Sequence, residues 1–218
     1  MRRPGSRVRL VLDIVMVTFV MLFPHYGRLP MYAYPFLILG VLWLYLYLFG
    51  ERFKNIGFRF ADFNWRAIGI GGIAGLLFAV FNFELLGPWL MHLGFRQPNV
   101  SDFAYIRHHF LNFVLLILLA SLIVIPYEEI VFRGFVLNRL KVFFGDNGNA
   151  VSFSGLFASI LFALYHWQEG WGAMIAIFIF AVIITFVYRK FKSNLWYAIF
   201  FHITYDVFML TMILIGKM

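Results

Sequence analysis

Six ionisable side chains stand out in this sequence because each lies within or beside a long apolar segment. A charged group at the centre of a bilayer costs about 2.5–3.5 kcal/mol on insertion scales, so such residues usually face a cavity and have a function. A carboxylate and an imidazole together can bind and deprotonate a water molecule, and a second imidazole can donate to a developing oxyanion. The residue types therefore predict acid–base chemistry on water. The six residues are Glu128, Glu129, Arg133, His166, His202 and Asp206.

The first group is the stretch P-Y-E-E-I-V-F-R-G at residues 126–134, which follows an uncharged run that begins at Phe110. Glu129 and Arg133 are four residues apart and lie on one helix face, in the order that favours an ion pair. Glu128 lies about 100° round the helix. We expect Arg133 to hold Glu129 ionised and Glu128 to point unpaired into a cavity, as a general base. The alternative is a structural network in which both carboxylates neutralise the arginine.

Two further groups place one histidine each in an apolar segment. Phe162 and His166 are four residues apart, and so are His202 and Asp206. A single histidine in an apolar helix is commonly a core residue, but two on separate helices beside a glutamate pair favour a shared site. Weaker candidates in other apolar segments are Asp13, Asn82 and Glu84, the last expected near the outer interface.

The composition places the chain in a membrane. Of its 218 residues, 63% are hydrophobic and 13% charged, and the mean hydropathy is +0.85, whereas soluble domains have about 45–50% apolar residues. The absence of cysteine excludes disulfides and thiolate metal sites. The net charge of +8 comes from basic residues clustered between apolar runs. This pattern is typical of membrane topology and of contact with anionic lipid, not of nucleic-acid binding.

Seven apolar runs lie near the ~20 residues that span a bilayer. They predict an all-α polytopic membrane protein with about seven to eight transmembrane helices, because helices satisfy their own backbone hydrogen bonds in lipid. We expect these helices to enclose an intramembrane cavity and to form a single domain, residues 1–218. The fourth run is long enough to bend or break at Pro126. The runs are 10–24, 30–50, 67–91, 111–140, 151–169, 171–188 and 194–216.

The distribution of basic residues predicts the orientation of the chain. Fourteen of the 18 Lys and Arg residues, Arg2 and Arg3 among them, lie in the N-terminal segment and in the stretches 51–66, 133–150 and 189–193. The positive-inside rule therefore predicts a cytoplasmic N-terminus. The 51–66 loop interleaves aromatic and basic residues, which favours a segment lying on the cytoplasmic leaflet. The remaining four basic residues are Arg28, Arg96, Arg107 and Lys217.

Three motifs in order carry a family resemblance: E-E-x-x-x-R at 128–133, F-x-x-x-H at 162–166 and H-x-x-x-D at 202–206. Together they resemble the CPBP family, which comprises the CAAX prenyl endopeptidases of the Ras-converting type and the bacterial Abi or bacteriocin-processing proteases. The resemblance covers about residues 110–210. Each motif alone is a weak signal, but three in this order are specific.

The resemblance implies an intramembrane endopeptidase of the glutamic type that uses no metal or cofactor. By position in the motifs, Glu128 would activate the water, with His166 beside it. Glu129 and Arg133 would support Glu128, and Phe162 would support the histidine of its own motif.

The last motif departs from part of the family. His202 and Asp206 would form the oxyanion side, but the farnesyl-protein members carry asparagine at the second of these positions. An ionised Asp206 cannot donate a hydrogen bond, and would instead orient and charge His202.

The resemblance also implies the partner of the protein, a membrane-embedded or lipid-anchored protein or peptide substrate. The short chain without extended loops is typical of a prokaryotic member. We therefore expect an integral protein of the plasma (inner) membrane that processes or sorts anchored proteins.

In a simple hairpin of the fourth and fifth runs, Glu128 and His166 would lie at different depths in the membrane. His166 lies about 15 residues, or ~22 Å, into its run, which separates it from Glu128. We expect the fifth helix to begin in a deep cytoplasmic funnel at Ser154 and Gly155, approached through the polar stretch 146–149.

Two other functions fit the same residues. In the first, Glu128, His166 and His202 bind zinc in a membrane metalloprotease, although the chain has no H-E-x-x-H motif. In the second, the buried acids and histidines form a proton relay in a transporter, or belong to a non-enzymatic membrane scaffold. No paired halves with interrupted helices are visible in the sequence to favour transport.

Overall fold

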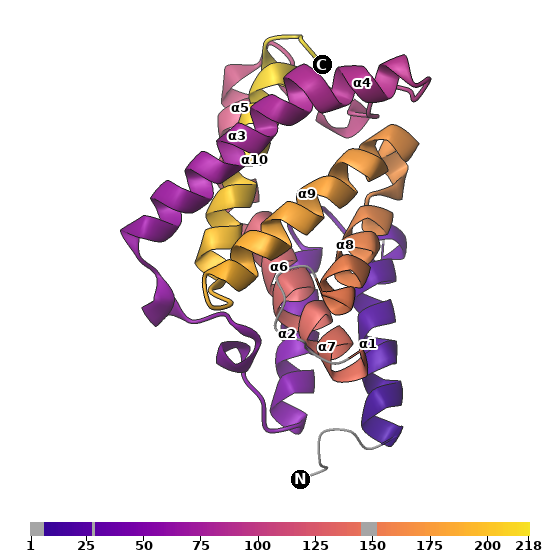
Figure 1. Ribbon diagram of the computed structural model, residues 1–218, viewed down its shortest axis with the longest axis vertical. Coiled ribbons are helices and arrows are strands. Elements are labelled where there is room, and N and C mark those ends of the chain that lie inside the picture. Colours follow the sequence, from indigo (N-terminus) through magenta and orange to yellow (C-terminus); the bar gives the residue numbers. More distant parts are fainter. Residues whose placement is uncertain (1–6, 28, 145–151) are drawn as a thin grey trace.

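The computed structural model describes residues 7–27, 29–144 and 152–218, and in this part of the chain all regular structure is helical (Figure 1). Arg2, Arg3, Arg28 and the stretch 146–149, which entered the predictions above, lie outside the described residues. The α-helices are α1 (Arg7–Tyr26), α2 (Tyr34–Leu48), α3 (Gly72–Phe81), α4 (Gly87–His92), α5 (Phe110–Leu119), α6 (Ile125–Glu129), α7 (Leu137–Phe144), α8 (Phe153–Tyr165), α9 (Trp171–Lys190) and α10 (Leu195–Leu214). Wider π-helical turns are η3 (Ala67–Gly71), η4 (Asn82–Leu86), η6 (Ala120–Val124) and η7 (Ile130–Val136), and short 3-10 turns are η1 (Phe53–Ile56), η2 (Phe60–Asp62), η5 (Ser101–Ile106) and η8 (Trp167–Glu169).

Each predicted apolar run contains an apolar helix. Within the described residues, five helices are long and apolar enough to cross a membrane, and α2 and α8 are shorter apolar helices. The prediction of an all-α polytopic membrane protein is confirmed. The five long helices are Arg7–Tyr26, Ala67–His92, Phe110–Phe144, Trp171–Lys190 and Leu195–Leu214.

The helix Phe110–Phe144 continues through Pro126 without a break. Proline has no backbone N–H, so it removes one hydrogen bond from the helix interior. The π-helical turn η6 ends two residues before Pro126, and a second, η7, begins four residues after it. Such widened turns accommodate a disturbed hydrogen-bond ladder and are frequent at functional sites. The helix is therefore not broken at Pro126, and the bend expected there stays a prediction.

The length of this helix also removes the conflict of depths. The helix runs from Glu128 to Phe144, about 24 Å at 1.5 Å per residue. The chain returns in α8, which packs against α7, and His166 follows Phe153 by about 20 Å of helix. A simple hairpin thus brings Glu128 and His166 to similar depths.

The predicted funnel at Ser154 and Gly155 is wrong, because both residues are buried at the start of α8. The Ser152 side chain accepts a hydrogen bond from the Gly155 backbone N–H, and its oxygen lies 2.9 Å from that of Ser154. The Ser159 hydroxyl donates to the Gly155 carbonyl at 2.9 Å. These polar groups satisfy the helix end and one another, so they line no entrance.

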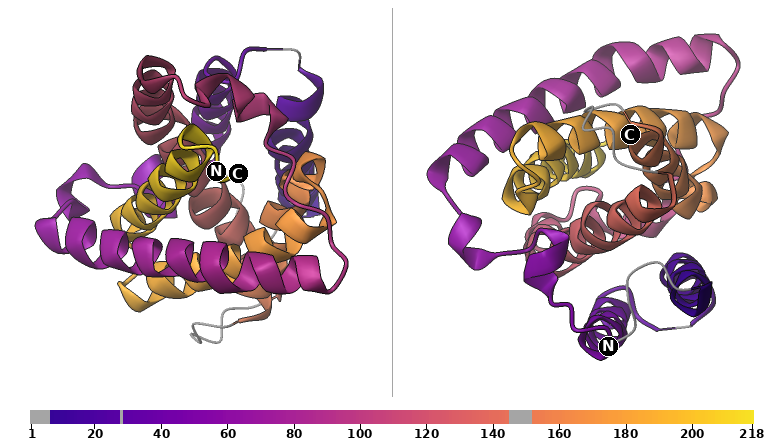
Figure 2. Two further views of the ribbon diagram at one scale, coloured as in Figure 1. Left: turned by 90° about the horizontal axis from the view of Figure 1, so that it is seen from above. Right: turned by 60° about the horizontal axis from the view of Figure 1, so that its bottom comes forward.

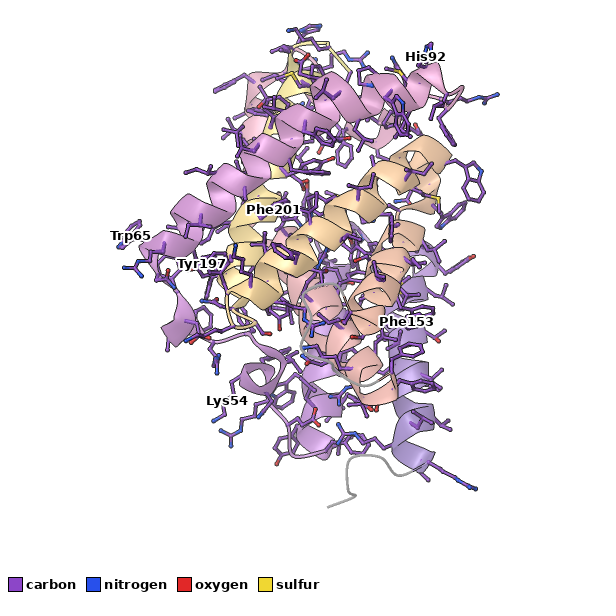
Figure 3. The ribbon with its side chains drawn as sticks, in the orientation of Figure 1. Lys54, Trp65, His92, Phe153, Tyr197 and Phe201 are labelled. Carbon is purple, nitrogen blue, oxygen red and sulfur yellow. The ribbon has the colours of Figure 1, made fainter. Side chains whose placement is uncertain are left out.

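The helices α3 and α10 approach at two glycines spaced four residues apart. A Cβ atom at Gly71 would lie 2.6 Å from the Tyr197 carbonyl oxygen, and one at Gly75 would lie 2.2 Å from the Phe201 carbonyl oxygen. Figure 3 labels Tyr197 and Phe201 on α10. Without a hydrophobic force between helices in lipid, such small residues let backbones pack closely. This contact fixes α10 one residue before His202.

The two ends of the molecule differ in what they contain. The N-terminus and the C-terminus lie at opposite ends (Figure 1), and Lys54 and His92 mark these two ends in Figure 3. The views in Figure 2 show the 51–66 segment passing across the end that carries the N-terminus. In this segment Ile56 is buried against Gly134, whereas Trp65 is 80% exposed.

At the same end, a network of charges joins α1, the segment that follows α2, and α7. Glu51 forms ion pairs with both Arg9 and Arg139. Asp13 lies 3.8 Å from Arg9 and 3.3 Å from Arg139, and accepts a hydrogen bond from the Tyr45 hydroxyl at 2.6 Å. Two of the basic residues counted toward topology are therefore paired inside the protein. Burial raises the pKa of Glu51, but the hydrogen bonds and charges of Arg139 and Arg9 outweigh it, so this pKa lies below its usual value.

We expect Gly75→Ala to destabilise the protein by about 1–3 kcal/mol, because the new methyl group overpacks the α3–α10 contact. Gly69→Ala is the matched control, since nothing lies within 4 Å of its Cβ position. Thermal unfolding in detergent micelles measures both variants. Equal stability of the two variants would contradict the proposed close approach.

We expect Glu51→Gln to lower stability at pH 7 by roughly 1–3 kcal/mol, because two arginines lose a charged acceptor. A carboxylate with a lowered folded pKa stabilises above its unfolded pKa, and this contribution disappears as the pH falls through the folded pKa. The difference from the wild type should therefore shrink below about pH 4.5, the ordinary value for Glu51.

The control for this variant is Asp62→Asn, which removes an ion pair with Arg59 whose side chains are 25% and 48% exposed. Such a surface pair contributes about 0–1 kcal/mol. A loss in Asp62→Asn as large as that in Glu51→Gln would refute the special role of the network.

Candidate active site

The structure places the predicted residues around one internal cavity of about 610 Å³. Glu128, His166, His202 and Asp206 all line it, and so does Phe162. The lining also includes the segment 98–103 and Met218, which belong to the end of the molecule that carries the C-terminus (Figure 1). In the described part of the chain, no residue of the 51–66 segment or of the α7–α8 end lines it. The cavity therefore extends from the middle of the bundle toward the C-terminal end.

Glu129 lies at the centre of the polar contacts beneath the cavity. Its side chain is fully buried, and one oxygen, Oε1, accepts hydrogen bonds from Arg133 Nη1 at 3.2 Å and from His202 Nδ1 at 2.8 Å. The predicted pair with Arg133 is present. The contact with His202 was not predicted, and it makes Glu129 the residue that orients the imidazole across two helices.

His202 Nε2 points away from Glu129 toward two further carboxylates. It lies 3.8 Å from Glu128 Oε2 and 3.6 Å from Asp206 Oδ1. Because Nδ1 donates its proton to Glu129, the second nitrogen is left to act in the cavity. Glu128 is not within hydrogen-bond distance of Arg133, as the helix geometry predicted. One nitrogen of the imidazole, Nδ1, thus has a fixed partner, and the other, Nε2, lies near the carboxylates of Glu128 and Asp206.

His166 follows α8 and faces the same cavity. Its Nδ1 lies 2.9 Å from the Phe162 carbonyl oxygen. Since a carbonyl only accepts, Nδ1 carries the proton, and Nε2 is left with a lone pair that can take a proton from water. No hydrogen bond or ion pair joins His166 to Glu128 within the described residues, so the two groups share the cavity without touching.

Aromatic rings hold the three motifs against each other. The Phe162 ring lies 4.8 Å from that of His166 and 6.1 Å from that of His202. The Arg133 guanidinium lies over the Phe162 ring, 4.1 Å from its centre. This cation–π contact favours a desolvated guanidinium. Phe162 thus touches one residue of every motif.

Sequence reasoning missed several polar residues of the cavity. Tyr34, Tyr165, Tyr205 and Glu169 line it. Tyrosine is too common in this chain to mark a site, but Glu169 follows His166 by three residues, a spacing that could have identified it. Burial, together with the charges of Asp206, Glu128 and Asp102, raises the pKa of Glu169 to about 8.

The weaker candidates separate into three environments. Asn82 lines the cavity and donates a hydrogen bond to the Tyr205 hydroxyl at 2.7 Å. Asp13 belongs to the charge network with Arg139, and Glu84 is exposed on the surface of its helix. Only Asn82 of these three belongs to the candidate site.

The geometry gives no support to the zinc hypothesis. In the part of the chain that the structure describes, no group of three His, Asp or Glu side chains is arranged to hold a metal ion.

The comparison with protein families agrees with the site. Residues 110–208 match the model of the family described as type II CAAX prenyl endopeptidase, Rce1-like. The match identifies residues 110–208 as an Rce1-like domain. The predicted resemblance is confirmed, and all three motifs fall inside the matched residues. No curated protein and no solved structure shows a significant match to the chain.

The Rce1-like domain begins at α5 and ends within α10, so α1 to α4 lie outside the match. These earlier helices still pack with the domain, since Met16, Ile38 and Phe78 belong to the same buried core as Tyr127 and Phe132. The family is a protease family.

We expect Glu129→Gln to lower the kcat of peptide cleavage by about 10²–10⁴-fold, because a neutral amide no longer fixes the His202 tautomer. KM should change much less, since Glu129 does not face the cavity. The matched control is Glu51→Gln, a glutamate in an arginine pair outside the cavity, whose folded fraction should keep its kcat. A loss that appears in KM alone, or equally in the control, would contradict this positioning role.

Proposed function

We propose that the protein is an intramembrane endopeptidase of the glutamic type that cleaves membrane-associated proteins or peptides. The observation that carries the proposal is the convergence of Glu128, His166 and His202 on one cavity inside an Rce1-like domain. These residues come from three separate helices, and their convergence supports a shared chemical role. The buried support by Glu129 is what an acid–base site requires.

The residues fit a hydrolysis without a covalent intermediate. Glu128 accepts a proton from a water molecule, and His166 Nε2 accepts a hydrogen bond from the same water. The resulting hydroxide attacks the scissile carbonyl carbon. The carbonyl π electrons move to the oxygen. A protonated His202 stabilises this oxyanion by donating a hydrogen bond from its Nε2–H. Collapse of the tetrahedral intermediate breaks the C–N bond, and Glu128 returns its proton to the leaving amine.

We assign Asp206 to His202. The 3.6 Å separation between Asp206 Oδ1 and His202 Nε2 supports a role in orienting and charging the imidazole. An ionised aspartate does not donate to the oxyanion as an asparagine does. The substitution relative to the farnesyl-protein members thus moves this position from donor to electrostatic partner.

We further propose that the protein lies in a prokaryotic plasma membrane with a cytoplasmic N-terminus and contacts anionic lipid through its basic loops. In that orientation the cavity extends toward the outer face, because its lining reaches Met218 and the 98–103 segment. Substrates would be lipid-anchored or membrane-embedded chains whose cleavage site reaches this face.

We expect Glu128→Gln and His202→Gln each to reduce cleavage of a membrane-anchored peptide by at least about 10²-fold, because each removes a proton-transfer or oxyanion group. Glu84→Gln, which changes an exposed residue outside the cavity lining, is the control and should keep activity. The assay is mass spectrometry of products in proteoliposomes, with folding checked by thermal unfolding. Normal cleavage by Glu128→Gln would overturn the assignment.

A chelator tests the zinc alternative in the same assay. We expect wild-type cleavage to persist in excess chelator. Loss of cleavage that added Zn²⁺ restores would instead support the metalloprotease.

A further inference from the structure

The cavity wall is rich in acidic side chains. Its lining includes four carboxylates, Asp102, Glu128, Glu169 and Asp206, and among the described residues it includes no lysine or arginine. Glu128 and Asp206 lie next to His202. Asp102 and Glu169 have no such neighbour, so the proposed catalytic groups do not account for them.

Glu169 is the more enclosed of these two residues. Its side chain is partly buried, whereas Asp102 is exposed. Within the described residues, the Glu169 carboxylate forms no ion pair and no side-chain hydrogen bond. A buried carboxylate is costly unless a cation or donors accompany it. Burial and the neighbouring carboxylates raise the pKa of Glu169.

The position of Glu169 is fixed by its backbone. It ends η8, three residues after His166, and its carbonyl oxygen accepts a hydrogen bond from the Asn99 backbone N–H at 3.0 Å. This bond joins the α8–α9 turn to the 98–103 segment, which carries Asp102. Both carboxylates therefore belong to one wall at the same end of the cavity.

The neighbouring tryptophans indicate that this end lies at the membrane surface. Trp167 and Trp171 flank Glu169 and are 58% and 74% exposed. Exposed tryptophan is enriched at the boundary between lipid and water. A chain that enters the cavity from this boundary would pass Asp102 and Glu169 before it reaches Glu128 and His202.

We propose that Glu169, assisted by Asp102, selects substrates that carry a lysine or arginine near the scissile bond. The cationic side chain supplies a partner for the partly buried carboxylate, while the apolar part of the substrate lies along Phe180, Ile177 and Leu116, which also line the cavity. This inference rests on the proposed endopeptidase function. It names the substrate class as apolar, membrane-associated peptides with a basic residue at the cleavage region.

The test uses the full chain in proteoliposomes and one set of membrane-anchored peptides. The peptides share an apolar sequence and differ at one position, which is Lys, Gln or Glu, moved in steps on both sides of the cleavage site found with the Gln peptide. At the position that contacts Glu169, we expect kcat/KM for Lys to exceed that for Glu by roughly tenfold or more, as a charge pair in a poorly solvated site implies.

Variants of the enzyme connect this preference to the residue. Glu169→Gln should bring the Lys-to-Glu ratio near unity, and Glu169→Lys should reverse it. Asp102→Asn should reduce the ratio by a smaller factor, because Asp102 is exposed. The control Glu84→Gln, on a surface outside the cavity, should leave both activity and ratio unchanged. Each ratio is measured within one variant, so a general loss of activity cancels.

The outcomes separate this inference from the function itself. If the wild type cleaves none of the peptides, the proposed endopeptidase function fails. If it cleaves the Gln peptide but treats Lys and Glu alike at every position, charge selection by Glu169 is refuted. A wild-type preference that survives in Glu169→Lys would also refute it, since another residue would then be responsible.

Discussion

The fold depends on a single buried carboxylate that two helices must share. Glu129 is fully enclosed, and its oxygen Oε1 accepts hydrogen bonds from Arg133 on its own helix and from His202 on α10. An ionised group in such surroundings is strongly destabilising unless charged partners satisfy it. The arginine lies on the same helix as Glu129, so its contact is local. The contact with the histidine forms only if α10 packs at one particular depth and with one particular rotation about its axis. The same contact between Glu129 and His202 therefore positions α10 and orients the imidazole.

Features far from the cavity meet that requirement. The glycines Gly71 and Gly75 let α3 lie against the α10 backbone at Tyr197 and Phe201, next to His202. The length of helix from Glu128 to Phe144 sets the length that α8 needs to place His166 at the cavity. In lipid, where apolar surface gains nothing by leaving the solvent, close packing and satisfied polar groups decide such positions.

Polar residues in apolar segments serve two purposes in this protein. At the end that carries the N-terminus, Arg9, Asp13, Glu51 and Arg139 neutralise one another and tie α1 to α7. At the other end, carboxylates face an open cavity that holds no arginine or lysine among its described lining residues. The side chains of the first group are paired with one another and stabilise the fold, whereas those of the second group are available to bind a ligand. Residue type does not distinguish the two, because the same side chains occur in both.

The membrane class, an apolar helix in each of the seven predicted runs, the family resemblance and the residues of the three motifs could all be predicted from the sequence. Hydrophobic run length and four-residue spacings are local properties, and helix geometry translates them directly into faces and pairs such as Glu129–Arg133. Four features could be seen only once the helices were packed. Glu129 holds His202, His166 lies level with Glu128, Asp13 belongs to a structural network, and Glu169 faces the cavity. Each of these depends on how far a helix continues and which neighbour it meets. Those distances are set by packing between segments that the sequence spaces apart, so no local pattern contains them.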